Sequence, residues 1–439
     1  MEKQAPIVII GAGCAGLGAA YELRQRGIPA TVYEKHDVYG GLCRSFTVDG
    51  YTFDTFAHVN FSRDPYVRSL LEERTPYLTH VPEAMNYAQG HWVRNPVQNN
   101  LVGLPVEERI RIIKDFIARD QVGGEGSTYY DWLLRQYGAY FTDHYPALYT
   151  RKYWTVEASQ LEEKWIGARM YAPTLDEVLF GAMTEETPNV HYTKEIHYPK
   201  EGGYQAFLAP LANEADIAYR KSLQEIDLAK KTVSFTDGST VPYGTLLSTI
   251  PLPKVVAGIR QSVPDEVTAA AAALDHTSGV MVSVGLSCGN VAPALWFYIY
   301  DEEIYPARVY APNIKSPHNV PPGCSALQAE VYYSRYKPLR QSIEEIRDAT
   351  VSQLIAMGLF TPENVRCVDV RQETYANIMF TPAIYVARQT VRDYLTAQGI
   401  ITAGRFGEWD YLWTGESLLS GREAARRAME VHGGRSVRS

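Results

Sequence analysis

The sequence lacks the features that mark several large classes of protein. No run of about 18 apolar residues occurs, so we expect no membrane span. The first residues show neither the basic segment nor the cleavage site of a secretory signal, which predicts a cytoplasmic protein. The net charge of −8, from 42 basic and 50 acidic residues, argues against nucleic acid as a partner.

Cysteine is also scarce. There are five, an odd number with no C-x-x-C spacing: Cys14, Cys43, Cys288, Cys324 and Cys367. This pattern indicates neither a disulfide framework nor a zinc site, and we expect no metal. We interpret Cys14 as a small buried residue beside a glycine motif rather than as a reactive thiol.

The first forty residues do carry a pattern, and it is typical of a dinucleotide-binding βαβ unit. An apolar β-branched run over 7–10 leads into three glycines with the spacing G-x-G-x-x-G, namely Gly11, Gly13 and Gly16. These glycines allow a tight turn and let the backbone approach a pyrophosphate at a helix N-terminus. Glu34 ends the next predicted strand, where a carboxylate can accept hydrogen bonds from a ribose. The alternative is an ordinary glycine-rich turn.

A second glycine pair indicates which dinucleotide is bound. Gly40 and Gly41 precede Arg44, an arrangement that resembles the two-dinucleotide-binding-domain flavoproteins. In that class the pair and the arginine approach the diphosphate of FAD, so FAD is the expected cofactor. By the same resemblance, Gly404 and Arg405 lie in a segment that reaches the isoalloxazine ring.

We predict an α/β fold with an FAD-binding Rossmann-like domain, a helical insert and an antiparallel β-sheet substrate domain. The flavin domain is discontinuous, since its segments lie at both ends and in the middle of the 439 residues. The predicted boundaries are 1–75 with 215–275 and 395–439 for the FAD-binding domain, 76–188 for the helical domain, and 189–214 with 276–394 for the sheet domain.

Five further segments resemble UDP-galactopyranose mutase, specifically its eukaryotic-type branch. In chain order they are FDTFAHVNFS (53–62), RNPVQNNLVGLP (94–105), KYWTVEASQLEEKWIGARMYAP (152–173), YPKEGGYQAF (198–207) and GRFGEWDYLW (404–413). The resemblance implies interconversion of pyranose and furanose forms of a nucleoside-diphosphate sugar without net redox change. N5 of reduced FAD is then the nucleophile at the anomeric carbon. A reductant such as NAD(P)H or a reductase is needed to prepare that form.

The resemblance also implies which side chains hold the diphosphate. Arg169 and Arg308 match the two family arginines, whose planar forks suit phosphate oxygens. Tyr411 matches a tyrosine that reaches the same group. Without the matching motifs, these arginines would read as solvated surface residues and the tyrosine as a rim residue.

Other matches concern the nucleotide and the flavin. Tyr298 and Gln98 match positions that contact the nucleotide, and Thr150 stands where the family has an asparagine near it. His58 matches a histidine beside the flavin ring, and we group it with the catalytic residues without assigning it as a base. A rim tyrosine, a polar turn and a structural histidine are the alternatives.

The sequence departs from the family on the substrate side. Phe56 and Ala57 replace two glycines before the histidine, which puts redox-linked motion of that loop in doubt. Asn95 and Val97 replace aromatic residues that stack on uracil, and Met379 replaces a further diphosphate tyrosine. These losses leave open a FAD-dependent oxidase or dehydrogenase of the amine-oxidase or protoporphyrinogen-oxidase type, and a non-enzymatic flavin-binding scaffold. The sugar, the base and the oligomeric state stay open.

Overall fold

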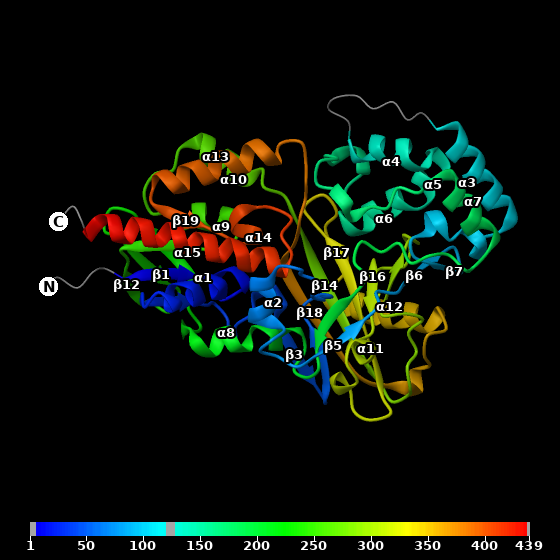
Figure 1. Ribbon diagram of the computed structural model, residues 1–439, viewed down its shortest axis with the longest axis horizontal. Helices are drawn as coiled ribbons and strands as arrows, with labels where there is room; N and C mark the ends of the chain where they lie inside the picture. Colours follow the sequence, from blue (N-terminus) through cyan, green and yellow to red (C-terminus); the bar gives the residue numbers. More distant parts are fainter. Residues whose placement is uncertain (1–5, 120–127, 437–439) are drawn as a thin grey trace.

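The computed structural model describes residues 6–119 and 128–436. Figure 1 shows the N-terminal and C-terminal segments together at one side, a group of helices at the opposite end, and a long antiparallel sheet below those helices. The fold is therefore α/β, as predicted, with a parallel sheet and a second sheet that is antiparallel except for one pair of strands.

A five-stranded parallel sheet is assembled from segments far apart in the sequence. Its strands are β1 (Ile7–Ile10), β2 (Ala30–Tyr33), β9 (Asp216–Ala218), β13 (Thr245–Ser248) and β19 (Ile400–Thr402). The order is β19-β13-β1-β2-β9. All four residues of β1 are buried, because the sheet is covered on both faces.

Two helices cover one face of this sheet. Helix α1 (Cys14–Gln25) begins directly after the glycine turn, and α15 (Thr414–Ser436) lies along it (Figure 1). Ile7 and Ile9 pack into the core beside these helices, whereas Val8 and Ile10 belong to the core on the other side of the sheet. The alternation follows from the two-residue period of a strand.

The opposite face is covered by a small sheet and three helices. They are β10 (Leu223–Asp227), β11 (Thr232–Phe235), β12 (Thr240–Pro242), α9 (Leu252–Ala257), α10 (Asp265–Ala272) and α13 (Ile384–Ala397). Strands β10 and β11 pair antiparallel and form a hairpin that precedes β13. Helix α13 packs on α10 and on strand β19 of the parallel sheet. Most of α13 lies within 276–394, which we expected in the sheet domain, but the helix contacts the parallel-sheet domain instead.

A seven-stranded sheet forms the other large layer, in the order β18-β14-β17-β16-β15-β6-β7. The strands are β6 (Ala84–Ala88), β7 (His91–Arg94), β14 (His276–Leu286), β15 (Trp296–Ile299), β16 (Arg308–Tyr310), β17 (Ser325–Tyr333) and β18 (Val365–Ile378). Helices α11 (Pro312–Lys315) and α12 (Ile343–Ala356) pack against it. The antiparallel pairing of β14 with β17 and β18 confirms the predicted antiparallel sheet.

The helical region is shorter than expected at its start. The segment 76–188 opens with strands, because Ala84–Ala88 alternates buried and half-buried residues with the two-residue period of a strand. The helices are α3 (Val106–Ala118), α4 (Tyr129–Tyr137), α5 (Ala139–His144), α6 (Pro146–Tyr153) and α7 (Leu175–Met183). The smaller elements are β3 (Ser45–Val48), β4 (Tyr51–Asp54), α2 (Pro65–Leu71), β5 (Tyr77–His80), β8 (Ile196–Pro199), α8 (Ala209–Glu214) and α14 (Arg405–Glu408).

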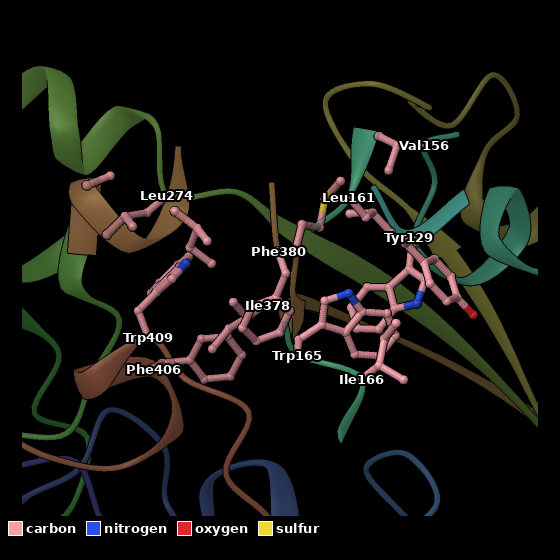
Figure 2. Close-up of a cluster of buried hydrophobic side chains, with 14 of the residues drawn as sticks. Tyr129, Val156, Leu161, Trp165, Ile166, Leu274, Ile378, Phe380, Phe406 and Trp409 are labelled. Carbon is pink, nitrogen blue, oxygen red and sulfur yellow. The ribbon is translucent and has the colours of Figure 1, made fainter. Parts of the chain in front are cut away.

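One apolar cluster joins the helical region to the flavin side. Figure 2 shows Trp409 and Phe406 at one end of it, Trp165 at the other, and the segment carrying Ile378 and Phe380 between them. The Phe380 carbonyl accepts a hydrogen bond from the Glu162 backbone N–H at 2.7 Å. Met379 is fully buried in the same core, so the residue in place of the family tyrosine serves packing.

The crossing of α1 and α15 yields a stability prediction. A Cβ on Gly421 would lie 2.0 Å from the Ala15 carbonyl oxygen, so the helices have to separate in Gly421→Ala. We expect a loss of about 1 to 3 kcal/mol in the free energy of unfolding, despite the better helix propensity of alanine.

Urea denaturation measures this loss, with Gly289→Ala as the control, since no atom lies within 4 Å of its added Cβ. Equal stability of the two variants contradicts the close crossing.

Candidate active site

A cavity of about 650 Å³ lies where the parallel sheet meets the seven-stranded sheet. The carboxyl ends of β1 and β13 contribute Ile10 and Thr249 to its wall, which is where open α/β sheets bind ligands. Strands β15 to β18 contribute the opposite wall, for example through Tyr298, Arg308 and Tyr332.

The glycine motif forms one end of the cavity, and its spacing is dictated by contact. A Cβ on Gly16 would lie 1.9 Å from the Gly11 carbonyl oxygen, so only glycine lets the helix follow the turn. The Gly40 backbone N–H donates to the Ala12 carbonyl at 2.8 Å, and Gly40 and Gly41 have φ values of 113° and 58°. The two glycine segments therefore form a single cradle.

Glu34 fixes the shape of this cradle. Its carboxylate accepts hydrogen bonds from the backbone N–H groups of Ala12 at 2.8 Å and His36 at 3.0 Å, and it lines the cavity. Burial, followed by the charge of Arg44, lowers the pKa of His36 to about 4. The His36 Nε2 atom has no hydrogen-bond partner among the described residues, as expected of a polar atom at a ligand site.

The other expected cofactor residues surround the same space. Arg44 lines the cavity and forms an ion pair with Glu373 of β18. Gly404 has φ of 80° and precedes α14, and Arg405 donates to the Leu412 carbonyl at 3.3 Å and to Asn377 Oδ1 at 3.2 Å. Both line the cavity.

Two guanidinium groups lie over the ring of Tyr411. The Cζ atom of Arg169 is 4.3 Å from the centroid of its ring, and that of Arg405 is 4.6 Å away. Arg169 also lies 4.8 Å from the ring of Trp413 and donates to the Trp165 carbonyl at 2.7 Å. Arg169 itself is not a lining residue, but Tyr411 and Trp413 both are.

Arg308 reaches the cavity from β16 and is held by a buried carboxylate. Its Nε donates to Glu330 Oε2 at 2.7 Å, and Glu330 is fully buried. The Tyr332 hydroxyl donates to the same oxygen at 2.6 Å. Burial opposes the charge of Arg308, but Glu330 and Tyr332 outweigh it and raise the pKa of the guanidinium.

His58 lies on a loop fixed by two hydrogen bonds. The Ala57 backbone N–H donates to Glu330 Oε1 at 2.6 Å, and the Phe56 N–H to Met281 Sδ at 3.1 Å. The His58 ring stacks on Tyr204 at 5.2 Å, with Nδ1 3.2 Å from the Phe56 carbonyl oxygen. Burial opposes protonation, yet the charge of Cys43 raises the pKa of His58.

An aromatic rim completes the cavity. The rings of Tyr192 and Trp413 stack with 5.7 Å between centroids and 4° between planes, and Phe61 meets Trp413 edge-on at 4.8 Å. Burial raises the pKa of the Tyr192 hydroxyl, and both Arg308 and Arg169 act to lower it. The charges of the two predicted diphosphate arginines therefore both act on the same tyrosine.

Two predicted residues lie away from this space. Gln98 donates to the Tyr171 carbonyl at 2.9 Å, and Thr150 donates to the Pro146 carbonyl at 2.7 Å. Neither lines the cavity. Their contact with a nucleotide stays a prediction.

The family model for flavin-containing amine oxidoreductases matches residues 14–429. This chain belongs to that family. It is therefore a flavoprotein, and the cradle of Gly11, Gly13, Gly40 and Gly41 fits the diphosphate of its FAD.

Similar solved structures belong to different enzymes. A crystal structure of reduced UDP-galactopyranose mutase has a TM-score of 0.90 at 25% identity and covers 97% of this chain and 96% of its own. A structure assigned as protoporphyrinogen oxidase from Exiguobacterium sp. has a TM-score of 0.74 at 17% identity, covers 97% of this chain and 98% of its own, and shares the fold alone.

Sequence relatives match only a short segment. Protoporphyrinogen oxidase 2 of Arabidopsis thaliana is 39% identical over 67 residues, which are 15% of this flavoprotein and 13% of that relative. None of the helices in the part of the chain that the structure describes combines the length and apolar character needed to cross a bilayer.

Sequence reasoning missed three residues of the flavoprotein's cavity region. Glu330 lies in the buried strand β17. A charged residue among apolar neighbours in the sequence could have marked it as a site residue. Lys315 lines the cavity and pairs with Asp54 at 3.2 Å, and burial lowers its pKa. Trp413 lies two residues beyond Tyr411, at the end of the quoted motif.

Cofactor binding gives a prediction for Glu34→Ala. The substitution removes the carboxylate from the cradle and leaves the Ala12 and His36 N–H groups without their acceptor. We expect FAD affinity to fall roughly tenfold to a hundredfold, equivalent to about 1.5 to 3 kcal/mol.

Fluorescence titration of apoprotein with FAD measures the change. Glu423→Ala, at an exposed position of α15, is the control. Unaltered affinity in Glu34→Ala removes the residue from the site.

Proposed function

We propose that this flavoprotein is a nucleotide-sugar mutase similar to the eukaryotic-type UDP-galactopyranose mutases. It interconverts pyranose and furanose forms of a nucleoside-diphosphate sugar without net redox change. One observation carries the proposal: Arg169 stacks on Tyr411, which lines the cavity, and the hydrogen bonds of Arg169 go to backbone carbonyls rather than to a carboxylate. A cation placed in this way suits an anionic ligand such as a diphosphate.

The protein's main task in such a reaction is to retain the departing diphosphate. Arg169 and Arg308 bind phosphate oxygens through their planar forks, which keep their charge throughout. The Tyr411 hydroxyl donates a third hydrogen bond, and its ring is kept in place by Arg169 and Arg405. Retention favours recapture, because the reacting groups stay within one cavity.

Reduced FAD supplies the nucleophile N5 when it is bound, and NAD(P)H or a reductase supplies its electrons beforehand. His58 lies on the flavin side of the cavity, stacked on Tyr204. Since a carbonyl only accepts hydrogen bonds, Nδ1 of His58 carries the proton that faces the Phe56 carbonyl. Nε2 is then the ring nitrogen that responds to nearby charge, which includes that of Cys43, the neighbour that raises the pKa of His58.

The aromatic rim offers a surface for the nucleobase. Asn95 and Val97 provide no stacking face, whereas Tyr192 and Trp413 present two parallel rings beside the diphosphate arginines. Tyr192 is 46% exposed, which leaves one side of the rim open to a ligand. The rings of this rim can stack on the nucleobase and so take the role of the aromatic residues that Asn95 and Val97 replace.

A FAD-dependent oxidase is the second candidate. The charge of Arg308 is already balanced by Glu330, and aromatic side chains form much of the wall. Such a cavity would accept an apolar or amine substrate, and Arabidopsis thaliana protoporphyrinogen oxidase 2 is among the sequence relatives.

The clamp is tested by Arg169→Lys and Arg308→Lys. Lysine keeps the charge but loses the two-point fork. We therefore expect kcat/KM to fall roughly thirtyfold or more, equivalent to a loss of about 2 kcal/mol in transition-state stabilisation. FAD content should stay normal. Steady-state kinetics with a nucleotide sugar that the wild-type enzyme converts measure the effect. Arg426→Lys, at an exposed site of α15, is the control. Wild-type turnover in both variants removes the clamp.

The flavin's redox state separates the two candidates. Dithionite-reduced enzyme under anaerobic conditions should interconvert pyranose and furanose forms in a panel of nucleoside-diphosphate hexoses and pentoses, over many turnovers and without further reductant. Oxidised enzyme should be inactive, because only reduced flavin has the electron pair for attack on carbon.

Product analysis by chromatography and a peroxide assay provide the readout. An oxidase gives the opposite pattern, with oxidised flavin bleached by the substrate and peroxide formed in step with product. Stoichiometric peroxide without furanose product rejects the mutase.

A further inference from the structure

Two cysteines lie in contact at the glycine cradle. Cys14 is the first residue of α1, and Cys43 ends a short 3₁₀ turn over Gly41–Cys43. Their sulfur atoms are 3.5 Å apart, and both are free thiols. A disulfide has sulfurs about 2.05 Å apart, so closure requires a shift of about 1.5 Å.

The surroundings of the two sulfurs differ. The Cys14 thiol, followed by His58, lowers the pKa of Cys43 despite its burial. The same contact raises the pKa of Cys14. Cys43 also lies 3.7 Å from the Thr414 hydroxyl. The thiolate is the reactive form of cysteine, so Cys43 is the nucleophile of the pair and Cys14 its neighbouring thiol.

Access distinguishes this pair from the other cysteines. Cys14 and Cys43 line the cavity, whereas Cys288, Cys324 and Cys367 do not. A small reagent that enters the cavity can therefore reach Cys43. The contact joins residues 29 positions apart, which is why the spacing gave no sign of a pair and Cys14 was expected to be inert.

The pair also joins the two segments that form the cradle. The Gly40 N–H donates to the Ala12 carbonyl, and a Cβ on Gly41 would lie 3.1 Å from the Gly13 Cα atom. A covalent bond between Cys14 and Cys43, both of which line the cavity, would hold these segments together.

We propose that Cys14 and Cys43 form a reversible disulfide that staples the two glycine segments, with hydrogen peroxide as the oxidant. The Cys43 thiolate attacks one oxygen of the peroxide and the O–O bond breaks. Hydroxide departs, and Cys43 becomes a sulfenic acid. Cys14 then attacks the Cys43 sulfur, the S–O bond breaks, and the oxygen leaves as water with the Cys14 proton. The two sulfurs together lose two electrons, which the peroxide gains, and an external dithiol reverses the bond.

Thiol mapping of the FAD-loaded protein tests the bond itself. After treatment with a few equivalents of peroxide, denaturation and alkylation, we expect two of the five thiols to be lost. Mass spectrometry should find a peptide linking Cys14 to Cys43 that dithiothreitol removes. Cys14→Ser should instead leave a sulfenic acid on Cys43 that dimedone labels, and Cys288→Ser should behave as wild type.

FAD release tests the staple. The stapled segments resist separation, so the oxidised protein should release FAD several-fold more slowly than the reduced-thiol form, and Cys14→Ser should show no such difference. Retention of all five thiols, or a link between other cysteines, overturns the proposal. A Cys14 to Cys43 link without slower release overturns the staple. If a variant does not fold, the wild-type peptide map still decides the first point.

Discussion

A buried charge needs a partner, and this requirement at Glu330 organises the cavity. The carboxylate is fully buried in β17 and is shared by Arg308, the Tyr332 hydroxyl and the Ala57 backbone N–H. Removal of one partner would leave part of a charge unsatisfied in a low-dielectric interior. The position of Arg308 and the position of the His58 loop are therefore set together, by one side chain.

The same loop is where the sequence departs from the mutases that it resembles. Phe56 keeps a φ of 65°, which a glycine adopts freely and a bulky residue rarely does. Its ring packs against Gly279, where an added Cβ would lie only 2.5 Å from the Phe56 ring. The Phe56 backbone N–H donates to Met281 Sδ. The backbone thus retains a glycine-like turn, but the side chain fixes it. This packing is a physical reason to expect little motion of the loop with the state of the flavin.

The cofactor side was predictable because its constraints are local. Glycine spacing follows from backbone contact between Gly11 and Gly16, and Glu34 follows the second strand at a fixed distance. Strands β5 to β7 were missed because they are short and precede a long helical stretch. Glu330 and the Cys14–Cys43 contact were missed because both depend on residues that are distant in sequence.

The charge balance of the cavity indicates where an anion would bind. Arg44 pairs with Glu373 and Arg308 pairs with Glu330, so much of their charge is already offset. Within the described residues, the hydrogen bonds of Arg169 and Arg405 go to neutral oxygens, and their Nε atoms have no partner. Both groups lie on the faces of Tyr411, where stacking fixes their planes but leaves their charge uncompensated. The uncompensated charge near Tyr411 therefore favours an anionic ligand there, whichever reaction the flavin performs.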